Sequence, residues 1–355
     1  MNKLICIFLI LLFTTKTENV YSNNLIYDVN NIEVKGKINN SFTNKKLIEL
    51  AFKKAFIVFI NKTLLKNDAQ NLYKTEIKTI KDLVLTYQIT ENKKNSNDET
   101  FLTLNIKFDS KKVNNFIAKK KISYADISNI SLTVLPIFIK DKDVFLYEEN
   151  FFYKNWIKSK ETKINKSDEL IDYNLALENI EDLEYINKNK NNINLINITN
   201  IDSFDNIENY VLLIIYFTED KFKAFIKTSI KNKKIDRNVE LNFYPQDTKR
   251  SYEEAITILK KEINQIWKEQ NLIDVNTPSF LDFFLIVNKN NDYLKIKSVL
   301  NNIDIIENYS VLEMTNKYTK VRIKYRGKIN KIKQKLSEQK INVQIIDNVW
   351  KLRIK

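Results

Sequence analysis

Apolar and polar residues follow two different spacings along the chain. In residues 43–65 and 251–271, apolar side chains recur every three or four positions, which is typical of helices with one buried side. In residues 82–93 and 317–327 they alternate with polar side chains, which is typical of strands with one buried face. Blocks of both kinds are mixed throughout the chain, so the pattern predicts an α+β protein.

The order of these blocks divides the chain after residue 22 into three small α/β sections, each with an antiparallel sheet. We predict an N-terminal domain at 23–129, a middle domain at 130–275 and a C-terminal domain at 279–355, which follows a break at Pro278. The last section reads β-α-β-β-α-β, which is the ferredoxin-like motif. Its final strand either runs straight on or folds back at Asp347–Asn348.

Two local features refine the middle section. Pro136 interrupts a predicted strand at 131–140, and because proline has no N–H to donate, we expect this strand at a sheet edge or a bulge. Ser251, with Glu254 three residues later, predicts the N-cap and capping box of the long helix at 251–271.

The N-terminus carries a short apolar run. Residues 4–13 are ten consecutive apolar residues, whereas a membrane-spanning helix needs about 20. Lys3 precedes the run, and Val20 and Ser22 stand at the −3 and −1 positions of a cleavage site after Ser22. This arrangement predicts a signal peptide at 1–22 and a periplasmic or secreted protein. A buried N-terminal strand or helix is the alternative, and the choice between cleavage and retention as an anchor stays open.

The predicted mature chain contains neither cysteine nor histidine. The sequence has no His, and its one cysteine, Cys6, lies inside the apolar run rather than at a lipoprotein cleavage site. Ser-His-Asp and Cys-His catalytic groups and Cys/His zinc sites are therefore excluded. The two glycines, Gly36 and Gly327, are far apart, so a Walker loop and a dinucleotide-binding fingerprint are also excluded. We expect no cofactor and no metal, and we do not expect an enzyme.

The formal net charge is +14, which suggests anionic partners such as nucleic acid or membrane surfaces. However, arginine, which grips phosphate in two places, supplies five of the 58 basic residues. Abundant Lys, Asn and Ile together are typical of the A/T-rich codons of a low-GC bacterium, and this bias accounts for the charge without a ligand. We therefore predict no specific nucleic-acid binding, and weak contact with anionic membrane surfaces.

Several motifs resemble those of a known family. After the predicted signal peptide, residues 29–56 (VNNIEVKGKINNSFTNKKLIELAFKKAF) are similar to a V-x-V-x-G opening followed by alanines four residues apart. Residues 179–186 (NIEDLEYI) resemble an L-x-D-x-E-D-L stretch. Together with the β-α-β-β-α-β end, these stretches resemble an uncharacterised envelope family of proteobacteria, the domain of unknown function 2066. The resemblance implies export and a multi-domain α/β build, and it implies no reaction.

Two groups of side chains are candidates for binding. Lys320, Arg322 and Lys324 alternate with apolar residues, so they share one sheet face, which either meets an anionic partner or is simply solvated. Phe152 and Trp156 have helical spacing and are either an exposed anchor for a partner or part of a core.

A third group is acidic. Paired carboxylates suit acid–base chemistry or Ca²⁺ binding, but acidic residues also favour the first turn of any helix. The members of the group are Asp172, Glu178, Glu181, Asp182 and Glu184.

These observations favour an exported, non-enzymatic binding or assembly module of the bacterial cell envelope, whose partner is another envelope protein. The first alternative is a carboxylate-dependent hydrolase in the periplasm. The second is a basic protein that binds anionic lipid or polyanion surfaces. The sequence leaves the identity of the partner and the oligomeric state open.

Overall fold

The computed structural model describes residues 25–37, 43–95, 99–125, 130–158, 171–192, 196–218, 221–273, 278–286, 292–346 and 349–354. The predicted signal peptide at 1–22 and the predicted turn at Asp347–Asn348 lie outside these ranges. The described chain forms two compact units, residues 26–276 and residues 277–355. The predicted N-terminal and middle sections both fall within the first unit.

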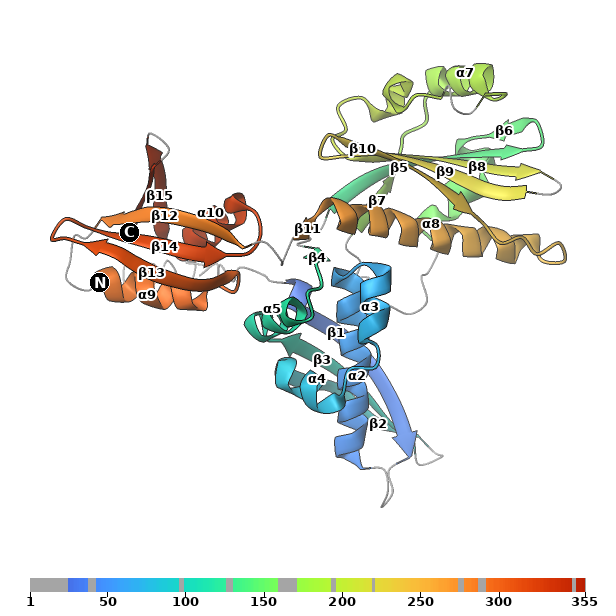
Figure 1. Ribbon diagram of the computed structural model, residues 1–355. Helices are drawn as coiled ribbons and strands as arrows, with labels where there is room; N and C mark the ends of the chain where they lie inside the picture. Colours follow the sequence, from blue (N-terminus) through green and yellow to red (C-terminus); the bar gives the residue numbers. More distant parts are fainter. Residues whose placement is uncertain are drawn as a thin grey trace, which may run out of the picture. The chain divides into compact units, whose positions relative to one another are not determined.

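The first part of unit 26–276 is a three-stranded antiparallel sheet in the order β1-β3-β2, with helices on one face (Figure 1). Its elements are η1 (Leu25–Tyr27), β1 (Asp28–Lys37), α2 (Asn44–Thr63), α3 (Lys66–Leu72), α4 (Ile77–Leu83), β2 (Val84–Lys94), β3 (Glu99–Phe108) and α5 (Ser110–Lys119). Helix α2 begins where the sequence predicts it, because the Thr43 hydroxyl accepts a hydrogen bond from Lys46 N at 3.5 Å. Ala51 and Ala55 of α2 are completely buried, so the helix lies close to the sheet.

The second part of the unit is a six-stranded mixed sheet in the order β10-β9-β8-β5-β6, with β7 also paired to β5. Its elements are β5 (Ile130–Lys140), β6 (Asp143–Phe145), η2 (Tyr147–Glu149), α6 (Phe151–Trp156), β7 (Ile171–Leu175), α7 (Ile180–Asn189), η5 (Ile198–Asn200), η6 (Asp202–Phe204), β8 (Tyr210–Thr218), β9 (Lys221–Ile230), β10 (Lys233–Glu240) and α8 (Thr248–Gln270). Strands β8, β9 and β10 form the expected antiparallel meander. The sheet differs from an all-antiparallel one because β5 runs parallel to β7 and β8.

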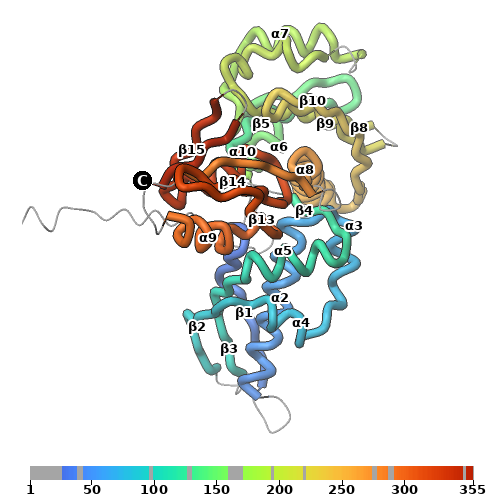
Figure 2. Tube along the Cα trace, turned by 60° about the vertical axis from the view of Figure 1, so that its left-hand side comes forward, coloured from blue at the N-terminus to red at the C-terminus, as the bar shows by residue number. Residues whose placement is uncertain are grey.

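This sheet is covered on both faces. Figures 1 and 2 both show it between α7 on one side and α8 on the other. Two separate apolar clusters fill these layers, one against α6 and α8 and one against α7, η5 and η6. Residues 211–215 of β8 are therefore all fully buried, as expected for a central strand.

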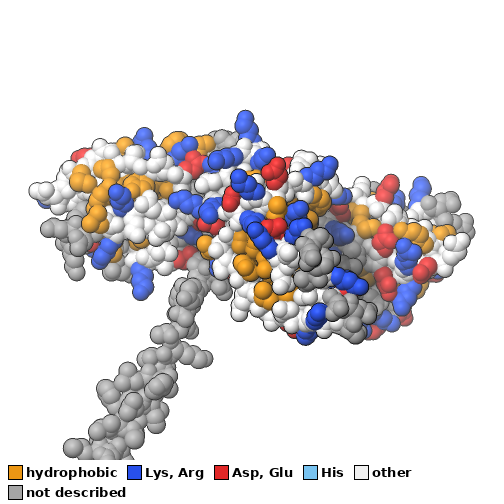
Figure 3. All heavy atoms as spheres, turned by 90° about the horizontal axis from the view of Figure 1, so that it is seen from below, with side chains coloured by type: hydrophobic (Ala, Val, Ile, Leu, Met, Phe, Trp, Pro, Cys, Tyr) orange, Lys and Arg blue, Asp and Glu red, His pale blue; other side chains and the backbone are white. Residues whose placement is uncertain are grey.

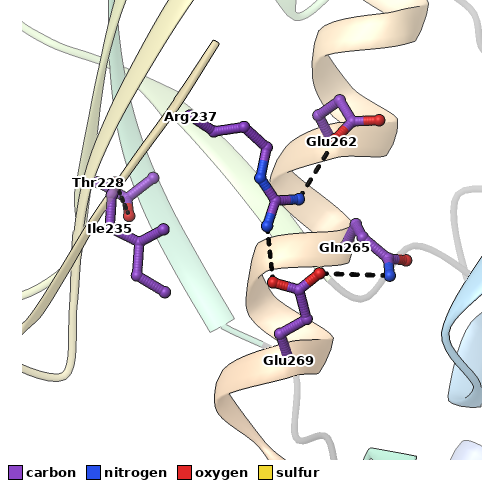
Figure 4. A network of polar contacts seen from close by, with 6 residues as sticks. All are labelled: Thr228, Ile235, Arg237, Glu262, Gln265 and Glu269. Carbon is purple, nitrogen blue, oxygen red and sulfur yellow. Dashed lines mark hydrogen bonds and ion pairs between the residues drawn. The ribbon is translucent and has the colours of Figure 1, made fainter. Parts of the chain in front are cut away.

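A polar network holds α8 against strand β10 (Figure 4). The Arg237 guanidinium lies 2.6 Å from a carboxylate oxygen of Glu269 and 3.3 Å from one of Glu262. Gln265 donates a further hydrogen bond to Glu269 at 3.5 Å. These ion pairs cross from the strand to the helix and fix its rotation about its own axis.

Strand β5 is neither an edge strand nor bulged against β8, with which its register is continuous from Thr133 to Lys140, and this corrects the expectation from Pro136. β8 pairs with one side of β5, and β7 and β6 pair with the two ends of the other side. Pro136 lies between those two ends, where the buried Asn150 side chain takes the place of a strand: its amide donates to Pro136 O at 2.8 Å and to Phe145 O at 3.1 Å. The missing N–H of Pro136 is tolerated because, among the described residues, no strand pairs with β5 at this position on the side away from β8.

The two parts of unit 26–276 are joined by short backbone contacts. Strand β4 (Tyr124–Ala125) pairs with β11 (Leu272–Ile273), and Leu64 forms an isolated bridge to Tyr124. Lys268, at the end of α8, donates to Leu64 O at 3.1 Å and to Asn61 O, so its ammonium group lies at the carbonyl end of α2. A cation is favourable there because the free carbonyls give the helix end a partial negative charge.

Burial lowers the pKa of Lys268 to about 8, from an ordinary value of 10.5. Between these two pH values the unfolded chain binds more protons than the folded chain, so the free energy of unfolding should rise with pH in this range. We expect the free energy of unfolding to rise by about 1–2 kcal/mol between pH 7 and pH 9. Urea unfolding at a series of pH values measures this rise. In the Lys268→Met variant this part of the rise should be lost. An unchanged dependence of the free energy of unfolding on pH would contradict a lowered pKa for Lys268.

Unit 277–355 is built from β12 (Ser279–Ile286), α9 (Asp292–Asn302), β13 (Ile306–Met314), β14 (Tyr318–Tyr325), α10 (Ile329–Glu338), β15 (Ile341–Ile346) and β16 (Val349–Ile354). The sheet order is β13-β14-β12-β16-β15. The first four elements form the split β-α-β arrangement of the ferredoxin-like motif, with β14 between β12 and β13. The last strand does fold back: β15 lies at the sheet edge, and β16 is inserted beside β12 and parallel to it. The described chain as a whole is therefore mixed α+β, as predicted.

Candidate functional site

The sheet of unit 277–355 has one covered face and one open face. Helices α9 and α10 contribute Ile296, Leu300, Ile332 and Leu336 to a cluster with the alternating buried residues of β12 and β14. The intervening side chains point to the opposite face, which no described element of this unit covers. Phe280 on β12 lies there with 61% of its surface exposed, and Phe284, four residues further along the same face, is half-buried.

The structure places the three predicted basic residues of β14 on this open face, but two of them are neutralised. Arg322 donates two hydrogen bonds to the Asp282 carboxylate, at 2.6 and 2.8 Å, and these bonds lower the pKa of Asp282. Lys324 lies 2.9 Å from a carboxylate oxygen of Glu307. Lys320 has an aromatic neighbour instead, since its ammonium lies 5.6 Å from the centre of the Phe284 ring.

Two further cations on this face were not singled out from the sequence. In the strand register Lys351 of β16 lies beside Phe284, and Arg353 follows two positions later on the same face. Neither forms an ion pair with a carboxylate of the described residues. The alternation of residues 349–354 (VWKLRI), with Trp350 and Leu352 buried, carries the same signal that identified β14.

We call five side chains of the open face the cationic platform: Phe280, near the start of β12, and Phe284, Lys320, Lys351 and Arg353, toward its end. The Phe284 ring lies between two lysines on neighbouring strands, and its other contact is the edge of Tyr318, with ring centres 5.2 Å apart. Cations beside a half-buried aromatic ring, with a second ring exposed on the same face, suit an anionic partner that also has apolar surface.

Phe152 and Trp156 are not an exposed anchor. Both side chains are fully buried in the core between the middle sheet and α8, where Phe152 contacts the rings of Phe138 and Tyr252. Helix α6 is six residues long, and its buried positions four residues apart both face this core. The spacing of Phe152 and Trp156 therefore reflects their place in the core, and neither side chain is available to bind a partner.

The acidic group divides into one structural residue and several exposed ones. Asp182 is buried, and its carboxylate accepts hydrogen bonds from Asp202 N at 2.7 Å, Ser203 N at 3.2 Å and the Tyr147 hydroxyl at 3.4 Å. Burial raises the pKa of Tyr147, so it stays a neutral donor. This carboxylate joins α7 to η6 and has little capacity left for a ligand. No group of three or more acidic, cysteine or histidine side chains within the described ranges is arranged to hold a metal ion.

Basic side chains are otherwise widely distributed. On the face that Figure 3 shows, Lys and Arg are interspersed with Asp and Glu and do not gather into one stripe. A nucleic-acid groove would require such a stripe. The face shown therefore agrees with a compositional origin for much of the positive charge.

None of the helices in the described segments is both long enough and apolar enough to cross a membrane. Comparison of the chain with protein-family models, curated proteins and solved structures gives no match. The resemblance to the envelope family stays a prediction that these comparisons neither support nor contradict.

Proposed function

We propose that the protein is an exported, non-enzymatic binding module of the cell envelope, which uses the cationic platform to bind an acidic, partly apolar surface of another protein. The observation that carries the proposal is the open sheet face of unit 277–355. There Phe280 is largely exposed and Lys351 and Arg353 have no carboxylate partner among the described residues. Export rests on the apolar run at residues 4–13 and the cleavage pattern before Asn23.

The chemistry of the platform favours a protein over a bare polyanion. Asp282 and Glu307 lie on the same face and already pair with Arg322 and Lys324, so a uniformly negative ligand would find no free cation at that part of the face. A protein surface can place apolar groups over Phe280 and carboxylates beside Lys351 and Arg353. Exposed charged side chains in such a protein–protein contact mainly set the association rate and the dependence of that rate on salt.

The test is co-purification of partners with the mature chain, residues 23–355, from the periplasmic fraction. The variant Lys320→Glu/Lys351→Glu/Arg353→Glu should capture at least tenfold less partner than the unaltered chain, because three attractions become repulsions. A matched control, Lys53→Glu/Lys233→Glu/Lys234→Glu, makes the same charge change at exposed positions elsewhere and should retain it.

Two results would contradict the proposal. One is equal capture by the platform variant and the control. The other is platform-dependent binding to vesicles of anionic phospholipid or to single-stranded DNA that persists near physiological salt while no protein is captured. That outcome would move the lipid or polyanion alternative into first place.

A further inference from the structure

Helix α7 and the short segment before it, which contains Leu177 and Glu178, carry an exposed apolar stripe. Leu177, Ile180 and Leu183 are 82%, 72% and 38% exposed, although the opposite side of the same helix is anchored in the core by Ile186 and Asp182. Ile180 and Leu183 lie one turn apart on α7, and Leu177 lies in the segment just before the helix begins. Large apolar side chains exposed in succession are uncommon on a surface that has no partner.

Glutamates accompany this stripe at the same spacing. Glu178, Glu181 and Glu184 are exposed, and none has an ion-pair partner in the described part of the chain. We call these six residues the acidic ridge: Leu177, Glu178, Ile180, Glu181, Leu183 and Glu184.

The surroundings of the ridge are acidic as well. β7, α7, η5 and η6 with their loops contain eight Asp and Glu residues in 171–187 and 196–209, and their basic residues, Lys188 and Lys190, lie at the C-terminal end of α7. The whole chain has a net charge of +14, so this layer departs from its composition. Codon bias toward lysine acts along the whole chain and does not explain a layer in which acidic residues outnumber lysines.

We propose that the acidic ridge docks on the cationic platform of a second copy of this chain, so that copies associate head to tail. The inference deepens the proposed function, on which it rests for one of its two surfaces. Three unpaired glutamates and three apolar side chains on the ridge match three cations and two phenylalanine rings on the platform. The match is between two different surfaces, so each copy keeps one free end and the contact can repeat.

The association should be weak and sensitive to salt. Two small patches bury less area than a standard stable interface, which points to a dissociation constant on the order of 10–100 μM at low salt. Because exposed charges contribute most of the complementarity, raising the ionic strength from about 50 to 500 mM should weaken association at least tenfold.

The experiment is sedimentation velocity on the mature chain over a range of concentrations, with two reversed variants. The ridge variant is Glu178→Lys/Glu181→Lys/Glu184→Lys, and the platform variant is Lys320→Glu/Lys351→Glu/Arg353→Glu. Each alone should remain monomeric. An equal mixture should regain association, because the intact platform of the first variant meets the intact ridge of the second, and the two reversed surfaces also carry opposite charges.

Controls separate this contact from general charge effects and from misfolding. Glu76→Lys/Asp236→Lys/Glu240→Lys makes the same charge change at exposed positions and should associate like the unaltered chain. Leu177→Ser/Ile180→Ser removes the two most exposed apolar side chains of the stripe, keeps every charge, and should weaken association at least fivefold. All variants should melt within a few degrees of the unaltered chain, because the substituted side chains are exposed or half-buried.

The proposal is overturned if the unaltered chain is monomeric at 200 μM in low salt, if the ridge variant associates normally, or if the mixed variants form no complex. In those cases the platform variant still shows whether the proposed function stands. Loss of the periplasmic partner alone would keep the function and reject self-association.

Discussion

Replacing Phe152 by Ala should lower the free energy of unfolding of unit 26–276 by about 3–5 kcal/mol. Phe152 is fully buried, and its ring centre lies 5.2 Å from that of Phe138 and 5.3 Å from that of Tyr252. The substitution leaves a cavity between the middle sheet and α8 that rigid neighbouring rings cannot fill. Urea unfolding monitored by tryptophan fluorescence measures the loss.

The control for this substitution is Ile157→Ala, immediately after the same short helix. Ile157 is 51% exposed, so its replacement should change the free energy of unfolding by about 0.5 kcal/mol or less. Similar losses for both variants would show that Phe152 is not in a tightly packed core and would reopen the surface interpretation.

Replacing Asn150 by Leu should cost about 3 kcal/mol, although the two side chains have similar size. The Asn150 amide donates to Pro136 O and Phe145 O, and its oxygen accepts from Phe152 N at 2.8 Å. Leucine leaves these three buried backbone groups without partners. The same urea measurement reports the effect, with Asn155→Leu as control.

Asn155 is half-buried and makes one bond, from its amide to Phe151 O at 2.9 Å. Its replacement should cost no more than about 1 kcal/mol. If Asn150→Leu were equally mild, water or local rearrangement would be satisfying the gap beside Pro136, and the explanation of that strand would be wrong.

Local patterns in the sequence predicted what depends on local spacing. The buried stripe of 43–65 and the Thr43 cap gave α2, and the alternation of 317–327 gave the buried and open faces of β14. These features depend on which side of one element is apolar, and that information lies within a dozen consecutive residues.

Other features depend on partners distant in sequence, and the sequence could not supply them. The long helix begins at Thr248 with Asp247 as its N-cap, because Ser251 is buried and accepts from Tyr244 N at 2.8 Å instead. Pro136 suggested an edge, but a side chain 14 residues away fills the gap beside β5.

The candidate site shows the same division. Alternation placed Lys320, Arg322 and Lys324 on one face, whereas the neutralisation of Arg322 by Asp282 and of Lys324 by Glu307 depends on strand register. Lys351 entered the platform because β16 folds back and inserts next to β12. The acidic residues favoured a helix start, and Glu181 and Asp182 do lie in the first turn of α7. The exposure of Leu177 and Ile180 beside the glutamates could be seen only in the three-dimensional structure.

The central claim is that the open sheet face of unit 277–355 is the binding surface, and site-directed photo-crosslinking in cells that produce the protein tests it most directly. Phe280 on the open face and Leu294 on helix α9 are both 61% exposed, so each accepts a photoreactive phenylalanine analogue without disturbing the core. The account predicts a strong crosslink to an acidic protein, or to a second copy, from position 280 and at least tenfold less from position 294. Equal crosslinking at the two positions, or crosslinking from 294 alone, would contradict it.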